Sequence, residues 1–271
     1  SGVAVGHWDA TSFTYLLNSD SESPFLAGSI IGNSFAGIEA SSGYAYGVLV
    51  AGNLAGEIVG NAFNQALDAD GNPAGVAITS GYSSGIWISG EVTQNGKINQ
   101  NSFAGIYTEG NDYANGVLVW MNLAGEIIGN VFNSVDVSSE RFAIRGGGAS
   151  GILISADVEA NGKINNNSFA GIEATSGNAF GVYVADNLAG EIVGNALTTI
   201  SGATDTMGVS VGRVSGGMVN GGTLSGTLTG TIADNSFGDI TSTGGSAYGV
   251  KVYHNIAEDG SINNNMFAKI T

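Results

Sequence analysis

The residues best suited to hold a metal ion stand in one short segment. Asp68, Asp70 and Asn72 alternate with small residues, which is the spacing of the oxygen ligands at the start of a calcium-binding loop. Such a loop needs Gly at its sixth position and a bidentate Glu at its last, where this chain has Pro73 and Thr79. Because Asp, Gly, Asn and Pro also favour tight turns, we interpret the segment as a turn and keep calcium as the alternative.

Residues that could support catalysis are sparse. A polysaccharide lyase or hydrolase needs clustered carboxylates with a base or a metal ion. The arginines are Arg141, Arg145 and Arg213, and Arg141 stands beside Glu140 in what reads as a solvated loop. The two histidines lie near opposite ends of the chain. The sequence therefore predicts no enzymatic activity and no cofactor, and a polysaccharide-degrading enzyme remains an alternative.

Aromatic and large apolar residues form a further pattern that could make contacts. A strand signature of Gly, apolar, any, apolar recurs along the chain, for example at 47–50, 85–88 and 116–119. If its apolar residues point inward, the residue between them points outward. The outward positions predict an exposed stripe made of Leu49, Trp87, Leu118, Leu153 and Tyr183, with Trp120 in the next outward slot. Such a stripe marks a contact surface or stacks sugar rings, unless inserted segments cover it.

A second repeat decides which fold positions these residues. The motif Ile-x-x-Asn-x-Phe occurs eight times, with Leu replacing the last Phe once. Its Ile anchors are Ile30, Ile58, Ile98, Ile127, Ile164, Ile192, Ile232 and Ile262. Short strands, Gly and Asn corners and a long period predict an all-β, single-domain parallel β-helix of about eight coils. Right-handed coiling is the default. We expect 1–29 to be an N-terminal coil or cap and 30–271 to be the repeat coils of that single domain, 1–271.

In such a fold equivalent residues stack at the spacing of neighbouring strands, about 4.8 Å. Ile and Phe then form columns in a dry interior. Asn suits a corner because it tolerates the left-handed conformation, and its amide can bond the Asn above and below. The residue before each Ile anchor tests this register, since Glu57, Lys97, Glu126, Lys163 and Glu191 alternate in charge, which is favourable on adjacent strands.

The composition excludes several classes of protein. The 271 residues include 45 Gly, 2 Pro and no Cys, and the net charge is −16. That charge excludes a basic surface for nucleic acid, and the lack of Cys excludes disulfides. A hydrophobic content of 43% is too high for a disordered chain. No apolar run approaches the roughly 18 residues of a membrane span.

The two repeats, the Gly, Asn and Ser richness and the absence of Cys resemble bacterial cell-surface and secreted β-helix proteins, such as autotransporter passengers and adhesins. The resemblance covers about 30–270 and defines a class. It implies an extracellular or cell-surface location, after removal of a signal that this chain does not contain. It also implies a structural or adhesive function, with a host or glycan surface as an alternative partner.

The ends of the chain predict self-association. The last repeat stops at Thr271, where the repeat would next need a Gly-apolar-any-apolar strand, and Gly2 to Val5 matches that strand. Unpaired ends of a solenoid are edges that other chains can extend. We therefore expect head-to-tail contacts between copies, through Gly2, Val3 and Val5 at one end and Phe267 and Ile270 at the other. Head-to-tail contacts that do not close give filaments.

Overall fold

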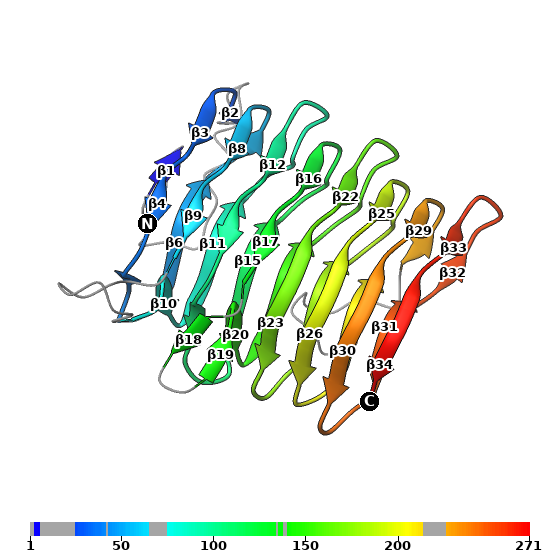
Figure 1. Ribbon diagram of the computed structural model, residues 1–271. Helices are drawn as coiled ribbons and strands as arrows, with labels where there is room; N and C mark the ends of the chain where they lie inside the picture. The colour runs from blue at the N-terminus through cyan, green and yellow to red at the C-terminus, as the bar shows by residue number, and fades with distance from the viewer. Residues whose placement is uncertain are drawn as a thin grey trace.

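The computed structural model describes residues 3–5, 25–41, 43–64, 75–133, 135–137, 140–213 and 226–271. Within these ranges every regular element is a β-strand and none is a helix. The strands lie side by side in chain order along one axis, from the N-terminal repeat to the C-terminal repeat (Figure 1). Nearly all neighbours pair in parallel, each with its equivalent one repeat away. The arrangement is consistent with a β-helix or solenoid.

The first sheet, called the β1–β31 sheet, is built from the Gly-apolar-any-apolar signature. Its eight strands, in spatial order, are β1 (Val3–Val5), β6 (Tyr44–Val50), β11 (Tyr82–Ile88), β15 (Tyr113–Val119), β21 (Gly148–Ile154), β24 (Ala179–Val184), β27 (Thr206–Val211) and β31 (Ala247–Val252). The apolar residues that flank the middle position, such as Val48 and Val50, are buried in the interior. The period-two pattern therefore sets which residues enter the core.

The second sheet, the β3–β33 sheet, carries the Ile anchors. Its eight strands are β3 (Ser29–Ile31), β8 (Glu57–Val59), β12 (Lys97–Asn99), β16 (Glu126–Ile128), β22 (Lys163–Asn165), β25 (Glu191–Val193), β29 (Thr231–Ala233) and β33 (Ser261–Asn263). The register places Lys97 opposite both Glu57 and Glu126. It likewise places Lys163 between Glu126 and Glu191. The predicted alternation of charge in this column is confirmed.

The third sheet, the β4–β34 sheet, has 12 strands and carries the Phe column. Its strands are β4 (Ser34–Phe35), β5 (Ile38–Glu39), β9 (Ala62–Phe63), β10 (Ile78–Ser80), β13 (Ser102–Phe103), β14 (Ile106–Thr108), β17 (Val131–Phe132), β20 (Ile144–Gly146), β23 (Ser168–Ala174), β26 (Ala196–Gly202), β30 (Ser236–Ser242) and β34 (Met266–Ile270). In the first repeats two short strands, such as β13 and β14, take the place that one longer strand, such as β23, has in later repeats. Successive Phe rings stack at 4.7–4.9 Å between centroids.

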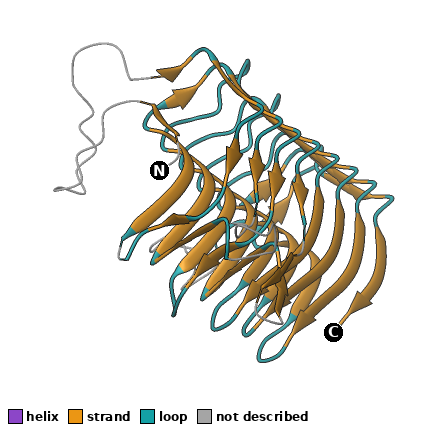
Figure 2. Ribbon diagram, turned by 60° about the vertical axis from the view of Figure 1, so that its left-hand side comes forward, coloured by secondary structure: helices purple, strands orange, loops and turns teal. Residues whose placement is uncertain are grey.

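Smaller pairs complete the described strands. They are β2 (Phe25–Leu26) with β7 (Asn53–Leu54), β28 (Thr227–Leu228) with β32 (Asn255–Ile256), and the antiparallel pair β18 (Val135–Val137) with β19 (Glu140–Phe142). Isolated bridges link Leu54 to Leu228 through one apolar residue of each repeat between them. The view turned by 60° shows the long strands following one another side by side (Figure 2). The assignment of 1–29 as a coil or cap falls largely outside the described residues, and the single-domain boundary stays a prediction.

The Asn residues form the predicted ladder at the corner between the second and third sheets. The side chain of Asn101 donates from Nδ2 to Oδ1 of Asn130 at 3.0 Å, and its backbone N–H donates to the same oxygen at 3.0 Å. Nδ2 of Asn101 also donates to the carbonyl of Ile58 at 2.9 Å. Every interior ladder Asn is almost fully buried. The ladder thus satisfies polar groups that would otherwise be costly inside the fold.

One expectation about the corner is wrong. The left-handed residue is the one that precedes each ladder Asn, and the ladder Asn itself has ordinary φ. The left-handed positions are Gly32, Gly60, Gln100, Gly129, Asn166, Gly194, Asp234 and Asn264. Six of these eight are Gly or Asn with φ between 52° and 69°, as the conformation favours, and the other two are Gln100 and Asp234, each with φ of 56°. The ladder Asn instead needs a regular backbone because its own N–H must point at the next Oδ1.

Candidate functional site

The outward stripe that the sequence predicted as exposed is mostly buried. Leu49 and Leu153 are 3% exposed, Trp87 is 6% exposed and Tyr183 is 0% exposed. Leu118 is half-buried, and Trp120 alone in this set is well exposed, at 45%. The prediction of an exposed stripe is therefore wrong for four of its six residues, and Leu118 is only partly exposed. Trp87 and Tyr183 have no open face on which a sugar could stack.

The cause is lateral packing on the outer face of the β1–β31 sheet. The ring of Trp87 lies 4.7 Å from the ring of Tyr46, and Tyr183 stacks on Phe180 at 4.6 Å. These residues belong to two apolar clusters that are separate from the interior core and that Leu118 joins. Strand alternation identifies the face on which a side chain lies, but it does not show what else packs on that face.

The sequence analysis missed a row of tyrosines on the same face. Tyr44, Tyr82 and Tyr113 occupy one slot in successive repeats, with ring centroids 5.1 Å and 6.4 Å apart. Tyr44 is 39% exposed and Tyr82 is 37% exposed. Burial and the nearby Asp112 carboxylate, which accepts a hydrogen bond from Tyr82, raise the pKa of Tyr82. The sequence feature that could have revealed this row is a Tyr three residues before the Gly of the strand signature in three consecutive repeats.

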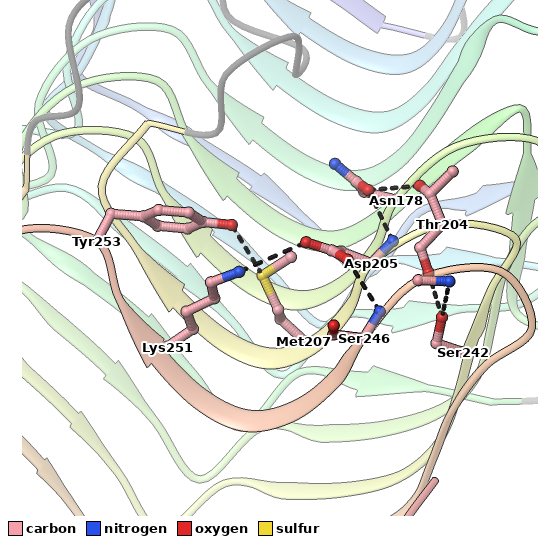
Figure 3. A network of polar contacts seen from close by, with 9 residues as sticks. Asn178, Thr204, Asp205, Met207, Ser242, Ser246, Lys251 and Tyr253 are labelled. Atoms are coloured by element: carbon pink, nitrogen blue, oxygen red, sulfur yellow. Dashed lines mark hydrogen bonds and ion pairs between the residues drawn. The ribbon is translucent and has the colours of Figure 1, made fainter.

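A polar network occupies the C-terminal end of this face (Figure 3). The Lys251 ammonium lies 4.1 Å above the Tyr248 ring, 4.6 Å above the Tyr253 ring and 3.4 Å from Oδ2 of Asp205. Oδ1 of Asp205 accepts the backbone N–H of Ser246 at 3.0 Å. Burial lowers the pKa of Lys251, but contacts with Tyr253 and Tyr248 outweigh it and raise the pKa above the usual value. The ammonium group of Lys251 is therefore held in place by Asp205, Tyr248 and Tyr253.

The arginines are paired separately. Arg213 donates from Nε and Nη2 to the two carboxylate oxygens of Asp186, at 2.8 Å and 2.9 Å. This hydrogen bonding raises the Arg213 pKa. Arg145 lies 3.4 Å from Glu173 on the β4–β34 sheet. The pairing of Arg141 with Glu140 as a charge pair falls on side chains outside the described set. Each of these two arginines thus pairs with a carboxylate that lies one repeat away.

The metal prediction cannot be followed in space, because Asp68, Asp70 and Asn72 lie outside the described residues. Among the residues that are described, no group of three or more His, Asp or Glu side chains could hold a metal ion. A shallow polar hollow of about 510 Å³ runs beside the charge column, lined by Glu126, Lys163 and Glu191 among others. Its charged groups alternate in sign along the column, as Glu126, Lys163 and Glu191.

Among the described residues, several apolar residues that continue the core columns are exposed at the C-terminal end. Ile256 is 54% exposed, Ile262 39% and Phe267 52%. Their equivalents one repeat earlier, which include Ile232 and Phe237, are fully buried. Ile270 is half-buried at the same end.

The N-terminal end differs. Strand β1 pairs with β6 in the predicted register, with Val3 opposite Val48 and Val5 opposite Val50. The match of this segment to the strand signature is therefore confirmed, while Gly2 lies outside the described residues. Ile30 and Phe35, the first members of their columns, are only 7% and 6% exposed. The two ends are thus unequal, since one buries its apolar columns and the other exposes them.

Comparisons with known proteins give no relative: no protein-family description, no curated protein and no solved structure matches the chain. In the part of the chain that the structure describes, no helix has the length and apolar character needed to cross a membrane. Any function must therefore be argued from the two ends and the outer face themselves.

Proposed function

We propose that the chain is a right-handed parallel β-helix of about eight coils that serves as a non-enzymatic structural module outside the cell. In this proposal copies associate end to end through the C-terminal face, which we define as Ile256, Ile262, Met266, Phe267 and Ile270. Continuous Ile, Asn and Phe columns support a stiff rod, because every repeat is tied to the next by both packing and hydrogen bonds. The resemblance to secreted β-helix proteins supports the location.

The observation that supports the proposal is the exposure of apolar residues on the C-terminal face. Met266 is 67% exposed and Phe267 52%, and both belong to a strand, β34, that pairs with a neighbour on one edge, β30. Exposed apolar residues beside an open strand edge favour association with another strand. The edge strand β1 of a second copy offers a continuation for β31, since β1 already follows the register of that sheet.

The experiment measures the mass of the purified 271-residue chain by light scattering over a wide range of concentrations. We expect mass to rise with concentration for the native sequence and to stay at the monomer value for Phe267→Glu. Trp120→Glu is the matched control, because Trp120 is exposed to a similar degree but lies away from the end. A native chain that stays monomeric in several salts would overturn the proposal, and so would equal loss of association in both variants.

A second candidate function is adhesion to a glycan or host surface. The observation that favours it is the partly exposed tyrosine row, Tyr44 and Tyr82, on the same outer face as exposed Trp120. Aromatic rings provide the apolar faces on which sugars stack. Binding to a glycan array that is lost in Tyr44→Ser with Trp120→Ser, while folding is retained, would support this role. The polysaccharide-degrading alternative gains no support from the described residues.

A further inference from the structure

The tyrosine row on the outer face of the β1–β31 sheet brings two phenol rings together from successive repeats. Tyr44 and Tyr82 are directly opposite each other in the parallel register of β6 and β11. Their ring centroids are 5.1 Å apart, and the ring planes are inclined to each other by 26°. The two side chains are 39% and 37% exposed, so small molecules in solution can reach both rings. The pair thus combines close contact with access from solvent.

Two phenol rings held in such contact can be joined by oxidation. Each ring loses one electron and its hydroxyl proton, and the unpaired electron that remains is shared by the ring carbons next to the oxygen. One such carbon of each ring forms a new C–C bond, and the hydrogen on each bonded carbon moves to the oxygen to restore a phenol. One hydrogen peroxide molecule accepts the two electrons and two protons and becomes two water molecules. Fixed positions of the two rings favour this coupling over reaction with another partner.

The Asp112 carboxylate lies where the proton of Tyr82 must go. Burial and this carboxylate raise the pKa of Tyr82, so Tyr82 is a neutral phenol at neutral pH. A neutral phenol must release its proton when it loses an electron, and a carboxylate within hydrogen-bond reach is a base that can accept it. Asp112 therefore favours oxidation of Tyr82, the ring that lies against Tyr44.

The other contacts between tyrosine rings in the described part of the chain are less suited to coupling. The rings of Tyr82 and Tyr113 are 6.4 Å apart, and Tyr113 is half-buried. Tyr46 lies 6.0 Å from Tyr44, but it is only 6% exposed and packs against Trp87 at 4.7 Å. Tyr44 and Tyr82 are thus the closest of these pairs and the most exposed.

We propose that Tyr44 and Tyr82 form an oxidative cross-linking site, at which a peroxidase and hydrogen peroxide join the two rings as dityrosine. The link ties β6 to β11 covalently, in a chain that has no Cys with which to form disulfides. A bond between two repeats restricts the unfolded chain, as a disulfide does, so it stabilises the stacked strands against unfolding. Both rings belong to one chain, so the reaction does not depend on association between copies.

The test treats the dilute 271-residue chain with hydrogen peroxide and a haem peroxidase. Dityrosine is measured by its fluorescence and located by mass spectrometry of the digested monomer. Tyr44→Phe and Tyr82→Phe keep each ring but remove its hydroxyl. Tyr107→Phe is the matched control, because Tyr107 is also partly exposed and its ring contacts Phe142, at 5.9 Å. Oxidation of the native sequence in urea measures coupling without the folded contact.

We expect a monomer that has lost two hydrogen atoms and that yields a peptide in which Tyr44 is joined to Tyr82. Dityrosine should fall at least about tenfold in Tyr44→Phe, in Tyr82→Phe and in urea, because the fixed ring positions promote coupling. It should keep its native level in Tyr107→Phe. Undiminished dityrosine in Tyr82→Phe, a link found only between chains, or oxidation confined to Trp120 would overturn the proposal. A cross-linked chain that unfolds in urea at the same midpoint as the untreated chain would overturn the stabilising role of the link.

Discussion

Gly85 lies directly against the ring of Phe103, so that a Cβ atom added to Gly85 would stand 2.6 Å from Cε1 of that ring. The same relationship joins Gly47 to Phe63, at 2.1 Å. The Gly of one sequence signature and the Phe of the other are therefore a single packing unit across the interior. Gly is needed here for close approach, because Gly85 does not have a left-handed backbone.

Gly85→Ala tests this unit. The added methyl group would meet both the Phe103 ring and the carbonyl of Gly116, at 2.8 Å. We expect the free energy of unfolding, measured in urea, to fall by about 1–3 kcal/mol, as for other overpacked cores. Gly28→Ala is the control, since a Cβ there meets nothing within 4 Å. Equal stability of the two variants would show that the ring moves aside freely.

Phe103→Ala tests the aromatic column itself. Phe103 is fully buried and stacks on Phe63 and Phe132 at 4.9 Å and 4.7 Å. Its removal leaves a cavity, so we expect a loss of about 3–5 kcal/mol in the free energy of unfolding. Phe267→Ala should lose much less, because Phe267 is 52% exposed. Similar losses in both would contradict a column that stabilises the fold chiefly through burial.

The columns of the fold could be predicted from the sequence, because they require only that equivalent residues of successive repeats stack on one another. The Ile, Asn and Phe of the motif keep the same spacing to one another in every repeat, as at Ile98, Asn101 and Phe103, and a parallel register turns each position into a column. The outer face could not be predicted in this way. Burial of Trp87 depends on Tyr46, which stands in another slot of another repeat, and no periodicity links the two. The different exposure of the first and last Phe of the column could also be seen only in the structure, because the sequence alone does not show that Phe35 is buried while Phe267 is exposed.

Trp87→Ser with Tyr183→Ser tests the corrected view of the outer face. Both side chains are buried against aromatic neighbours, so each change removes packing and leaves a cavity. We expect a loss of about 3 kcal/mol or more per site in urea unfolding. Trp120→Ser should change stability little, because Trp120 is exposed. A double variant with native stability would restore the view that these residues pack little in the monomer.

Asp239 gives a prediction about pH. A hydrogen bond from Lys269, with Nζ 2.8 Å from Oδ1, lowers the pKa of Asp239 below its usual value. A lowered folded-state pKa stabilises the fold above the unfolded-state pKa, and this contribution is lost as pH falls through the folded value. Carboxyl chemical shifts should therefore titrate at lower pH in the native chain than in Lys269→Met. Identical titration curves would show that the pair is not formed in solution.

Asn101→Asp tests the direction of the hydrogen bonds in the Asn ladder. One carboxylate oxygen can still accept the N–H of Asn61, which now donates to Oδ1 of Asn101 at 2.9 Å. The other oxygen replaces Nδ2, and so faces Oδ1 of Asn130 and the carbonyl of Ile58, both acceptors. Since Asn101 is fully buried, we expect a loss of about 3–5 kcal/mol at neutral pH, as for an uncompensated buried charge.

Acid should partly reverse this loss, because burial raises the pKa of a carboxyl and its protonated form can donate to one of the facing acceptors. The stability difference between Asn101→Asp and the native chain is therefore expected to narrow as pH falls from 7 toward 4. Asn265→Asp is the control at the ladder's end, where the side chain is only half-buried and water can solvate the charge. A cost for Asn101→Asp that is small, or that does not change with pH, would mean that the Asn101 amide is not oriented with Nδ2 toward Oδ1 of Asn130 and the carbonyl of Ile58.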